Sequence, residues 1–385
     1  MEKPSPEEQL KRCRKCVMPE TWESINFDNQ GVCNVCHNIE IKREKIDWAK
    51  KREEFVELLK EYRGKGQYDC MVPFSGGKDS TYTVYTLVRD FHLKPLVVSF
   101  DHGFYRPKTQ DNRVKTLKQL GVDFLSFRPN WQVVKKVMME SLKRKGDFCW
   151  HCHTGVYAYP MQIAVKFNIP LIIWGQAKGE YEGYFKYNED ANIDEELFNR
   201  YTNLGINAED MVGMIDGVTM RDLEPFKYPS KEELSRIKCC SVGLGAFIPW
   251  DVKKQAEIIE KELGWQEDEV EGIPPGYGYE KVECMMQGVR DYLKYIKRGL
   301  GRTAHLASID IRDGRMTREE GMKLIKKYDG LRPASLDVFL KFLDITEEEF
   351  MEIALSHQVA PHKHDPSKVK RGKKLWDQDL WEQTP

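Results

Sequence analysis

The chain has 385 residues, and its 60 Lys and Arg balance 61 Asp and Glu to give a formal net charge of −1. This length allows two or three domains with hydrophobic cores, and the balanced charge lacks the basic excess of typical nucleic-acid-binding proteins. No apolar run approaches the ~18–20 residues that a membrane span needs, and the polar N-terminus lacks the apolar stretch of a signal peptide. We therefore expect a cytoplasmic protein with neither a membrane nor a nucleic acid as partner.

The first ~40 residues carry two CxxC pairs, Cys13/Cys16 and Cys33/Cys36, separated by 16 residues. This spacing is typical of a four-thiolate zinc site, and so short a segment could hardly fold on its own core. We predict a zinc-ribbon-like unit over residues 1–40, in which Zn²⁺ is a structural clip. A role in binding nucleic acid or a partner protein stays open. The charged residues 41–66, with apolar side chains at helical spacing, are predicted to form a linking helix.

An apolar run then ends in Ser75-Gly76-Gly77-Lys78-Asp79-Ser80, and a helix-like pattern follows at once. The first backbone N–H groups of a helix have no intrahelical partner, and the helix dipole favours negative charge there. The two glycines let the backbone approach an anion, and Lys78 adds a positive charge suited to phosphate. The GxxxxGK[ST] pattern of Walker-type loops is missing. We predict an ATP-binding loop of another type, made of all six residues, with Lys78 and Asp79 also catalytic.

From residue 67 to 245 apolar strand-like runs alternate with helical stretches. The expected strands are 70–74, 96–100, 123–127 and 171–174, and the expected helices lie near 79–91, 108–120, 130–144 and 155–168. This alternation predicts an α/β fold with a doubly wound parallel sheet, in which ligands bind beyond the carboxyl ends of the strands. The further ATP-binding candidates after these strands are Phe100, Asp101, Gly175 and Gln176. Lys178 is a candidate for stabilising developing negative charge.

Residues 180–217 interrupt the alternation with an acidic stretch, which is either a lid or docking insert or a plain solvated insertion. Residues 246–385 are expected to be mostly helical and to bind substrate or partners. Capping boxes are predicted to open helices after Ser230, Thr317 and Thr346. Arginines near glycines suit a carboxylate or a diphosphate, and the candidates are Arg298, Arg302, Arg312 and Arg315. The last ~25 residues form a basic tail.

Taken together, these motifs resemble the N-acetyl sugar amidotransferase family of the PP-loop ATP pyrophosphatase superfamily. The family acts in bacterial surface-polysaccharide pathways, such as those of lipopolysaccharide O-antigen, and in flagellar-glycan pathways. The resemblance rests on the double CxxC, SGGKDS, Asp101-His102-Gly103, Asp147-Phe148-Cys149-Trp150-His151-Cys152, Phe247-Ile248-Pro249-Trp250-Asp251 and the run from Tyr295 through Arg302 to Glu320.

The resemblance implies a PP-loop (HUP-type) domain that uses ATP and Mg²⁺. Its substrate would be a nucleotide-linked N-acetyl sugar, whose acetamido oxygen attacks the α-phosphate of ATP. Ammonia then displaces AMP and leaves an acetamidino sugar. The sequence shows neither an N-terminal cysteine nucleophile nor a Gly-x-Cys-x-Gly elbow. A separate glutaminase with an ammonia-channelling protein, resembling the histidine-pathway pair, is therefore the expected partner.

The pair Cys149/Cys152 supports an alternative function. In PP-loop tRNA sulfur transferases such a pair and a third cysteine hold a [4Fe–4S] cluster, and Cys239 or Cys240 could supply the third ligand here. A second metal, a redox pair and two buried thiols all stay open for Cys149 and Cys152.

Overall fold

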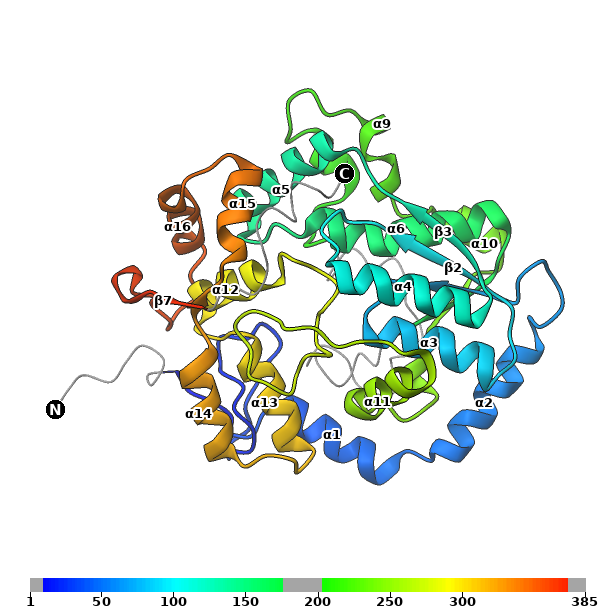
Figure 1. Ribbon diagram of the computed structural model, residues 1–385, viewed down its shortest axis with the longest axis horizontal. Coiled ribbons are helices and arrows are strands. Elements are labelled where there is room, and N and C mark those ends of the chain that lie inside the picture. The colour runs from blue at the N-terminus through cyan, green and yellow to red at the C-terminus, as the bar shows by residue number, and fades with distance from the viewer. Residues whose placement is uncertain (1–9, 176–202, 373–385) are drawn as a thin grey trace.

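The computed structural model describes residues 10–175 and 203–372 (Figure 1). Three predictions lie outside the described residues: ATP binding by Gln176, catalysis by Lys178, and any structure for the first two thirds of the 180–217 insert. Most of the basic tail, from residue 373 on, lies outside them as well.

A five-stranded parallel sheet forms the centre of the fold, with the strand order β3-β2-β1-β4-β5. The strands are β1 Cys70–Pro73, β2 Pro95–Phe100, β3 Asp123–Phe127, β4 Leu171–Trp174 and β5 Cys240–Gly243. Met71 of β1 lies opposite Leu96 of β2 on one side and Ile172 of β4 on the other. The chain moves outward from β1 to β3 and then crosses to β4, so the switch in strand order lies between β1 and β4.

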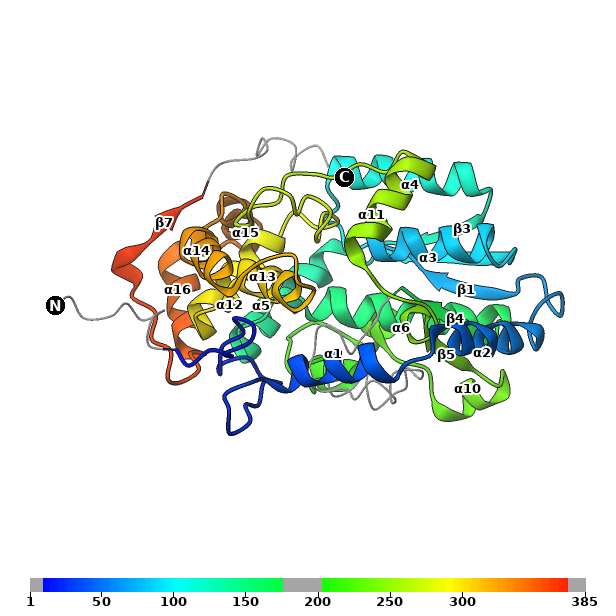
Figure 2. The ribbon, with the colours of Figure 1, turned by 90° about the horizontal axis from the view of Figure 1, so that it is seen from below.

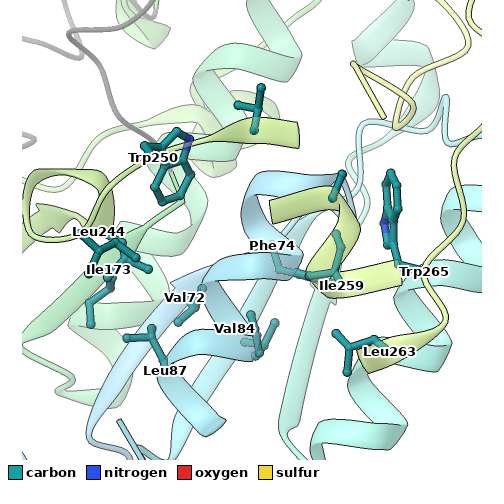
Figure 3. Packing of buried hydrophobic residues seen from close by; sticks show 14 of the residues in the cluster. Val72, Phe74, Val84, Leu87, Ile173, Leu244, Trp250, Ile259, Leu263 and Trp265 are labelled. Carbon is teal, nitrogen blue, oxygen red and sulfur yellow. The ribbon is translucent and has the colours of Figure 1, made fainter. Parts of the chain in front are cut away.

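Alternate residues of the strands enter two separate cores, because successive strand side chains point to opposite faces. Val72 and Ile173 pack with α3 (Lys78–Arg89) and α11 (Val252–Leu263), as Figure 3 shows, whereas Met71 packs with α6 (Trp150–Phe167). Figure 2 shows α3, α11 and α4 (Pro107–Leu120) on one face of the sheet and α6 on the other. The predicted doubly wound α/β fold is confirmed.

The segment expected to be one linking helix is two helices, α1 (Asn34–Lys45) and α2 (Trp48–Lys60). The break falls at Asp47, whose carboxylate accepts a hydrogen bond from the backbone N–H of Lys50 and caps α2. Helix α1 already begins between Cys33 and Cys36, and α2 places Phe55 in the core of the sheet. The two helices therefore join the cysteine segment to the sheet along one edge of the molecule (Figure 1).

The C-terminal region is mostly helical, as expected, and its later helices gather beside the sheet (Figure 1). The capping boxes at Ser230, Thr317 and Thr346 are all present. Helix α11 differs from the rest, because it belongs to the core of the sheet. The other elements are α5 Trp131–Lys145, α8 Ala208–Val212, α9 Met220–Leu223, α10 Lys231–Arg236, α12 Gln287–Arg298, α13 Arg302–Arg312, α14 Arg318–Tyr328, β6 Leu331–Arg332, α15 Ser335–Leu343, α16 Glu347–Ser356 and β7 Lys370–Arg371, with 3-10 turns at Glu224–Phe226, Leu244–Ala246 and Pro366–Lys368.

The described end of the insert is packed and not merely solvated. Ile206 and Met211 are buried in one cluster with Trp150 of α6, and the indole N–H of Trp150 donates to the carbonyl of Ile206 at 2.8 Å. Residues 203–217 therefore cover the start of α6. No helix among the described residues is long and apolar enough to cross a membrane.

Candidate active site

The SGGKDS loop connects β1 to α3, and Gly77 is the N-cap of that helix. Hydroxyl groups within the loop hold its shape: the backbone N–H groups of Ser75 and Gly76 each donate to Ser80 Oγ at 3.2 Å. Gly76 has φ +84°, and a Cβ there would lie 2.2 Å from Cγ of Arg113. The chain therefore requires glycine at this position. The loop leads directly into the N-terminus of α3, where the helix dipole favours an anion.

Lys78 lies between two carboxylates at the start of α3. Its Nζ is 3.0 Å from Asp79 Oδ2 and 2.5 Å from Glu280 Oε1, and the Lys78 and Glu280 side chains are each about 4–5% exposed. Burial alone would raise the pKa of Glu280, but the Lys78 ammonium and other cations lower it to about 2. Burial opposes the charge of Lys78 as well, yet Asp79 and Glu280 raise its pKa above the ordinary value. Both groups are therefore charged at neutral pH.

Gly175 follows β4 and touches the same helix terminus. A Cβ at Gly175 would lie 2.7 Å from Thr83 Oγ1 and 2.8 Å from the carbonyl oxygen of Asp79. The two predicted glycine sites thus meet at the switch point between β1 and β4, where a ligand of such a sheet binds.

The two residues at the end of β2 that were predicted to bind ATP, Phe100 and Asp101, already have partners within the fold. The carboxylate of Asp101 accepts from the Gly103 N–H at 2.8 Å and pairs with Arg128 Nη2 at 2.8 Å. The ring of Phe100 is buried against Phe226 and other aromatic rings of the core. The side chain of Phe100 is therefore occupied by core packing, and the carboxylate of Asp101 is already paired with Arg128.

A cavity of ≈ 270 Å³ opens at the loop and is shared by three parts of the chain. The sheet domain contributes the phosphate-loop end, the C-terminal helices contribute a charged wall, and the cysteine unit contributes one tryptophan. The lining residues are Trp22, Lys78, Asp79, Gly175, Trp250, Glu280, Lys281, Arg290, Asp291, Lys294, Leu300, Gly301, Arg302 and His305. Sequence reasoning pointed to the region of α12 and α13 but identified only Lys78, Asp79, Gly175 and Arg302 among these residues.

The part of the lining that comes from α12 and α13 carries an excess of positive charge. Arg302 Nη2 pairs with Asp291 Oδ1 at 3.1 Å, and Arg290 lies 3.8 Å from Asp147. Burial, followed by repulsion from Arg290 and Arg302, lowers the pKa of Lys294 to about 7. The cavity therefore has a phosphate loop at one side and a cluster of cations at the other.

Three of the four arginines predicted to bind substrate lie outside this cavity lining. Arg298 Nη1 donates to the carbonyl of Thr21 at 2.6 Å and so holds the cysteine unit. Arg315 Nε pairs with Asp310 at 2.8 Å, and Arg312 is buried beside the cysteines. Spacing along the chain could not tell which of these arginines would line the cavity, and substrate binding by the other three stays a prediction.

The four N-terminal cysteines are buried and close together, with their sulfur atoms all within 4.8 Å of one another. The Sγ–Sγ distances are 3.9 Å for Cys13–Cys36 and 3.8 Å for Cys16–Cys33. Four ligands about 2.3 Å from one tetrahedral Zn²⁺ would lie about 3.8 Å apart. The donor set therefore fits a single tetrahedral ion.

Two arginines beside the four cysteines also suit a site in which thiolates surround one metal ion. Arg318 Nε donates to the carbonyls of Cys13 and Cys16 at 3.2 and 3.1 Å. Arg312 interacts electrostatically with Cys16, and its Nε and Nη1 are buried without a hydrogen-bond partner. Four thiolates around a divalent ion carry two net negative charges, which such buried cations offset.

Cys239 and Cys240 do not lie beside Cys149 and Cys152, which corrects the predicted third ligand. Cys149 caps the start of α6, whereas Cys240 pairs with Leu171, four residues beyond the end of that helix. An 18-residue helix is about 27 Å long. The cysteine that packs in one cluster with Cys149 is Cys284, which sequence spacing did not single out.

The fold is an α/β fold with a glycine-containing loop and a cavity at the switch point of its parallel sheet. Residues 276–377 match the family described as "LPS biosynthesis protein WbpG-like, C-terminal domain". The match covers less than half of the chain, and it supports the family resemblance seen in the sequence.

Other known proteins are more distantly similar. An uncharacterised protein of Methanocaldococcus jannaschii is 24% identical over 166 residues, which span 43% of this chain and 58% of that protein, less than two thirds of its length. The U34-tRNA thiolase of Methanococcus maripaludis with its [4Fe-4S] cluster has a TM-score of 0.32 at 14% identity, covering 82% of this chain and 88% of its own. The NH3-dependent NAD synthetase of Campylobacter jejuni has a TM-score of 0.28 at 13% identity, covering 59% and 100%. At such scores neither structure assigns a function to this chain.

Proposed function

We propose that the protein is an ATP-using enzyme that activates the acetamido group of a nucleotide-linked N-acetyl sugar. The carbonyl oxygen attacks the α-phosphorus of ATP and pyrophosphate leaves. Ammonia then adds to the imidate carbon, the C–O bond breaks, AMP leaves, and an acetamidino sugar remains. The observation that carries the proposal is one cavity with the SGGKDS loop at one side and the cationic wall of α12 and α13 at the other. The family match of residues 276–377 to a lipopolysaccharide biosynthesis domain supports the polysaccharide setting.

The loop residues have distinct tasks in this reaction. The backbone N–H groups at the start of α3 bind the phosphates that become pyrophosphate, and Lys78 offsets the charge that develops on them. Glu280 holds the Lys78 ammonium in place through their 2.5 Å contact. Because an amide oxygen is a weak nucleophile, the main work of the site is to position it against the α-phosphate.

The residues beside the loop fit Mg²⁺. Asp79 Oδ1 is buried without a hydrogen-bond partner, and Mg²⁺ prefers one or two carboxylates together with substrate phosphates. Asp79, with Glu280 beside it, would hold the ion. When bound, Mg²⁺ neutralises charge on the phosphates. In the N-terminal unit, the four-cysteine geometry supports Zn²⁺ as the bound ion.

The test is AMP release from MgATP in ammonium chloride, with a panel of nucleotide-linked N-acetyl sugars and, separately, with bulk tRNA. We expect release with a sugar and not with tRNA, and an amidine in the sugar product by mass spectrometry. Cys149 and Cys152 interact electrostatically with Cys284, so the sulfur-transferase alternative is tested alongside the sugar reaction. Release with tRNA alone, together with iron in anaerobically purified protein, would establish that alternative and refute the sugar reaction.

A further inference from the structure

Trp22 belongs to the cysteine unit, yet it lines the same cavity as the phosphate loop. Its ring centroid is 5.2 Å from the Nζ of Lys294 on α12 and 6.2 Å from the ring centroid of His305 on α13. We call the part of the lining around Trp22, Lys294 and His305 the Trp22 end of the cavity; Lys78 and Gly175 belong to the same lining. Because Trp22 lines a cavity beside cations, its indole can contact a bound ligand, which a tryptophan inside a core cannot do.

The position of Trp22 is fixed by contacts of the residue before it. Thr21 Oγ1 donates to the carbonyl of Arg298 at 2.6 Å, and Arg298 Nη1 donates back to the carbonyl of Thr21 at 2.6 Å. The half-buried indole also packs against the apolar cluster of Val17 and Leu300. The cysteine unit thus holds a rigid aromatic surface over the start of α13.

The side chains around Trp22 point to the chemistry of the ligand. An indole presents a large flat apolar surface that suits the C–H face of a pyranose ring. Arg290, Lys294 and Arg302 stand on the same wall, and Asp291 opposes them in the lining beside Arg302. Three cations and one carboxylate therefore share this part of the lining, so like charges repel one another there. An anionic group would relieve that repulsion.

We propose that the Trp22 end of the cavity is the acceptor subsite, where an anionic N-acetyl sugar stacks on Trp22 and its diphosphate or carboxylate pairs with Arg290, Lys294 and Arg302. This inference rests on the proposed function. The cysteine unit then shapes the substrate site: the metal-bound knuckles present Trp22 to the acceptor, while ATP binds at the other end.

The experiment compares Trp22→Ala and Trp22→Phe with wild type in the full chain. Trp48→Phe, at the start of α2 and outside the cavity lining, is the matched control. Metal content and thermal melting first show which variants fold. The probes are UDP-linked N-acetylhexosamines and N-acetylhexosaminuronates, with binding followed by equilibrium dialysis and turnover by AMP release. We expect Trp22→Ala to raise the KM and Kd for the sugar about tenfold or more, with the KM for ATP within about twofold. Trp22→Phe should restore most of the loss.

The outcomes separate this inference from the proposed function. If the wild type releases AMP with a sugar but Trp22→Ala leaves the sugar KM unchanged, the subsite is refuted and the reaction stands. If the sugar binds in a Trp22-dependent way but AMP release occurs only with tRNA, the subsite is supported and the reaction is wrong. If the wild type neither binds nor turns over any sugar probe, both are overturned.

Discussion

Lys78 and Glu280 form a buried ion pair whose two members depend on each other. Replacing Lys78 with Met leaves the Glu280 carboxylate buried without its main cation, and we expect the free energy of unfolding to fall by about 3–5 kcal/mol. AMP release should fall to background, because the charge that develops on pyrophosphate loses its partner. Chemical denaturation and AMP release with the best sugar of the panel measure the two effects.

The double variant Lys78→Met/Glu280→Gln is the control for this pair. It removes the unpaired carboxylate, so most of the lost stability should return while AMP release stays at background. Recovery of activity in the double variant would show that Lys78 acts only on the fold.

Lys294 gives the acceptor site a pH dependence. Its pKa is lowered to about 7 by burial and by Arg290 and Arg302, against the opposing effect of Asp291 and Asp147. Lys294 is therefore a cation below about pH 7 and neutral above it. We expect the Kd of an anionic UDP-sugar to rise as pH increases from 6 to 8, measured by equilibrium dialysis.

The matched variant is Lys294→Arg, which keeps its charge across this range and should flatten the profile. His305 does not mask the effect, because burial followed by Arg302 lowers its pKa well below the ordinary value and keeps it neutral. An identical pH profile in wild type and Lys294→Arg would refute the role of this lysine.

At the scale of elements, the helices and strands that could be predicted are those that neighbouring residues in the sequence specify. Strand β1 is an apolar run buried on both faces, and the phosphate loop follows it directly, so both could be recognised from neighbouring residues. Strand β5, Cys240–Gly243, was missed because its one large apolar residue is Val242; its pairing with β4 specifies it.

The cavity residues from distant elements were missed for a related reason. Trp22, Glu280 and Lys294 come to line one cavity with the loop only when the cysteine unit and α12 pack against the sheet domain. No spacing along the chain encodes that docking. Capping boxes, by contrast, join residues three apart, and the one at Thr317 was therefore predictable.

The shape of the loop between β1 and α3 depends on the glycine at position 76. Gly76→Ala would place a Cβ at φ +84° and 2.2 Å from Arg113 Cγ, so the loop must shift. We expect AMP release to fall strongly and stability to fall by more than the ~1–2 kcal/mol of the backbone conformation alone. Gly64→Ala is the matched control, since Gly64 has φ +70° with nothing within 4 Å of the added Cβ. Equal losses of stability in the two variants would contradict the clash.

At the scale of the whole molecule, the cavity exists only because three segments meet. The sheet brings the phosphate loop, α12 and α13 bring the cations, and the cysteine unit brings Trp22. The cysteine unit is tied to this arrangement by Arg298 and Arg318, which donate to backbone carbonyls of Thr21 and Cys13. Unfolding of the cysteine unit should therefore weaken sugar binding at the Trp22 end of the cavity.

The cysteines of the whole chain decide whether it could release ammonia from glutamine by itself. Both kinds of glutaminase sought in the sequence use an activated cysteine thiolate, and all ten cysteines lie among the described residues. Four of them form the buried N-terminal cluster. Burial raises the pKa of the other six, Cys70, Cys149, Cys152, Cys239, Cys240 and Cys284. None of these six is a thiolate at neutral pH.

We therefore expect the purified chain to release AMP with ammonium chloride and not with glutamine. The measurement is AMP and glutamate formation with the sugar acceptor, at equal concentrations of the two nitrogen donors. Adding an unrelated active glutaminase should restore part of the turnover with glutamine, because free ammonia then reaches the cavity. Because ammonium supplies less ammonia as pH falls, the ammonium-dependent rate at a fixed salt concentration should rise with pH even where the sugar binds more weakly. Efficient glutamine-dependent turnover and glutamate release by the single chain would refute the need for a partner.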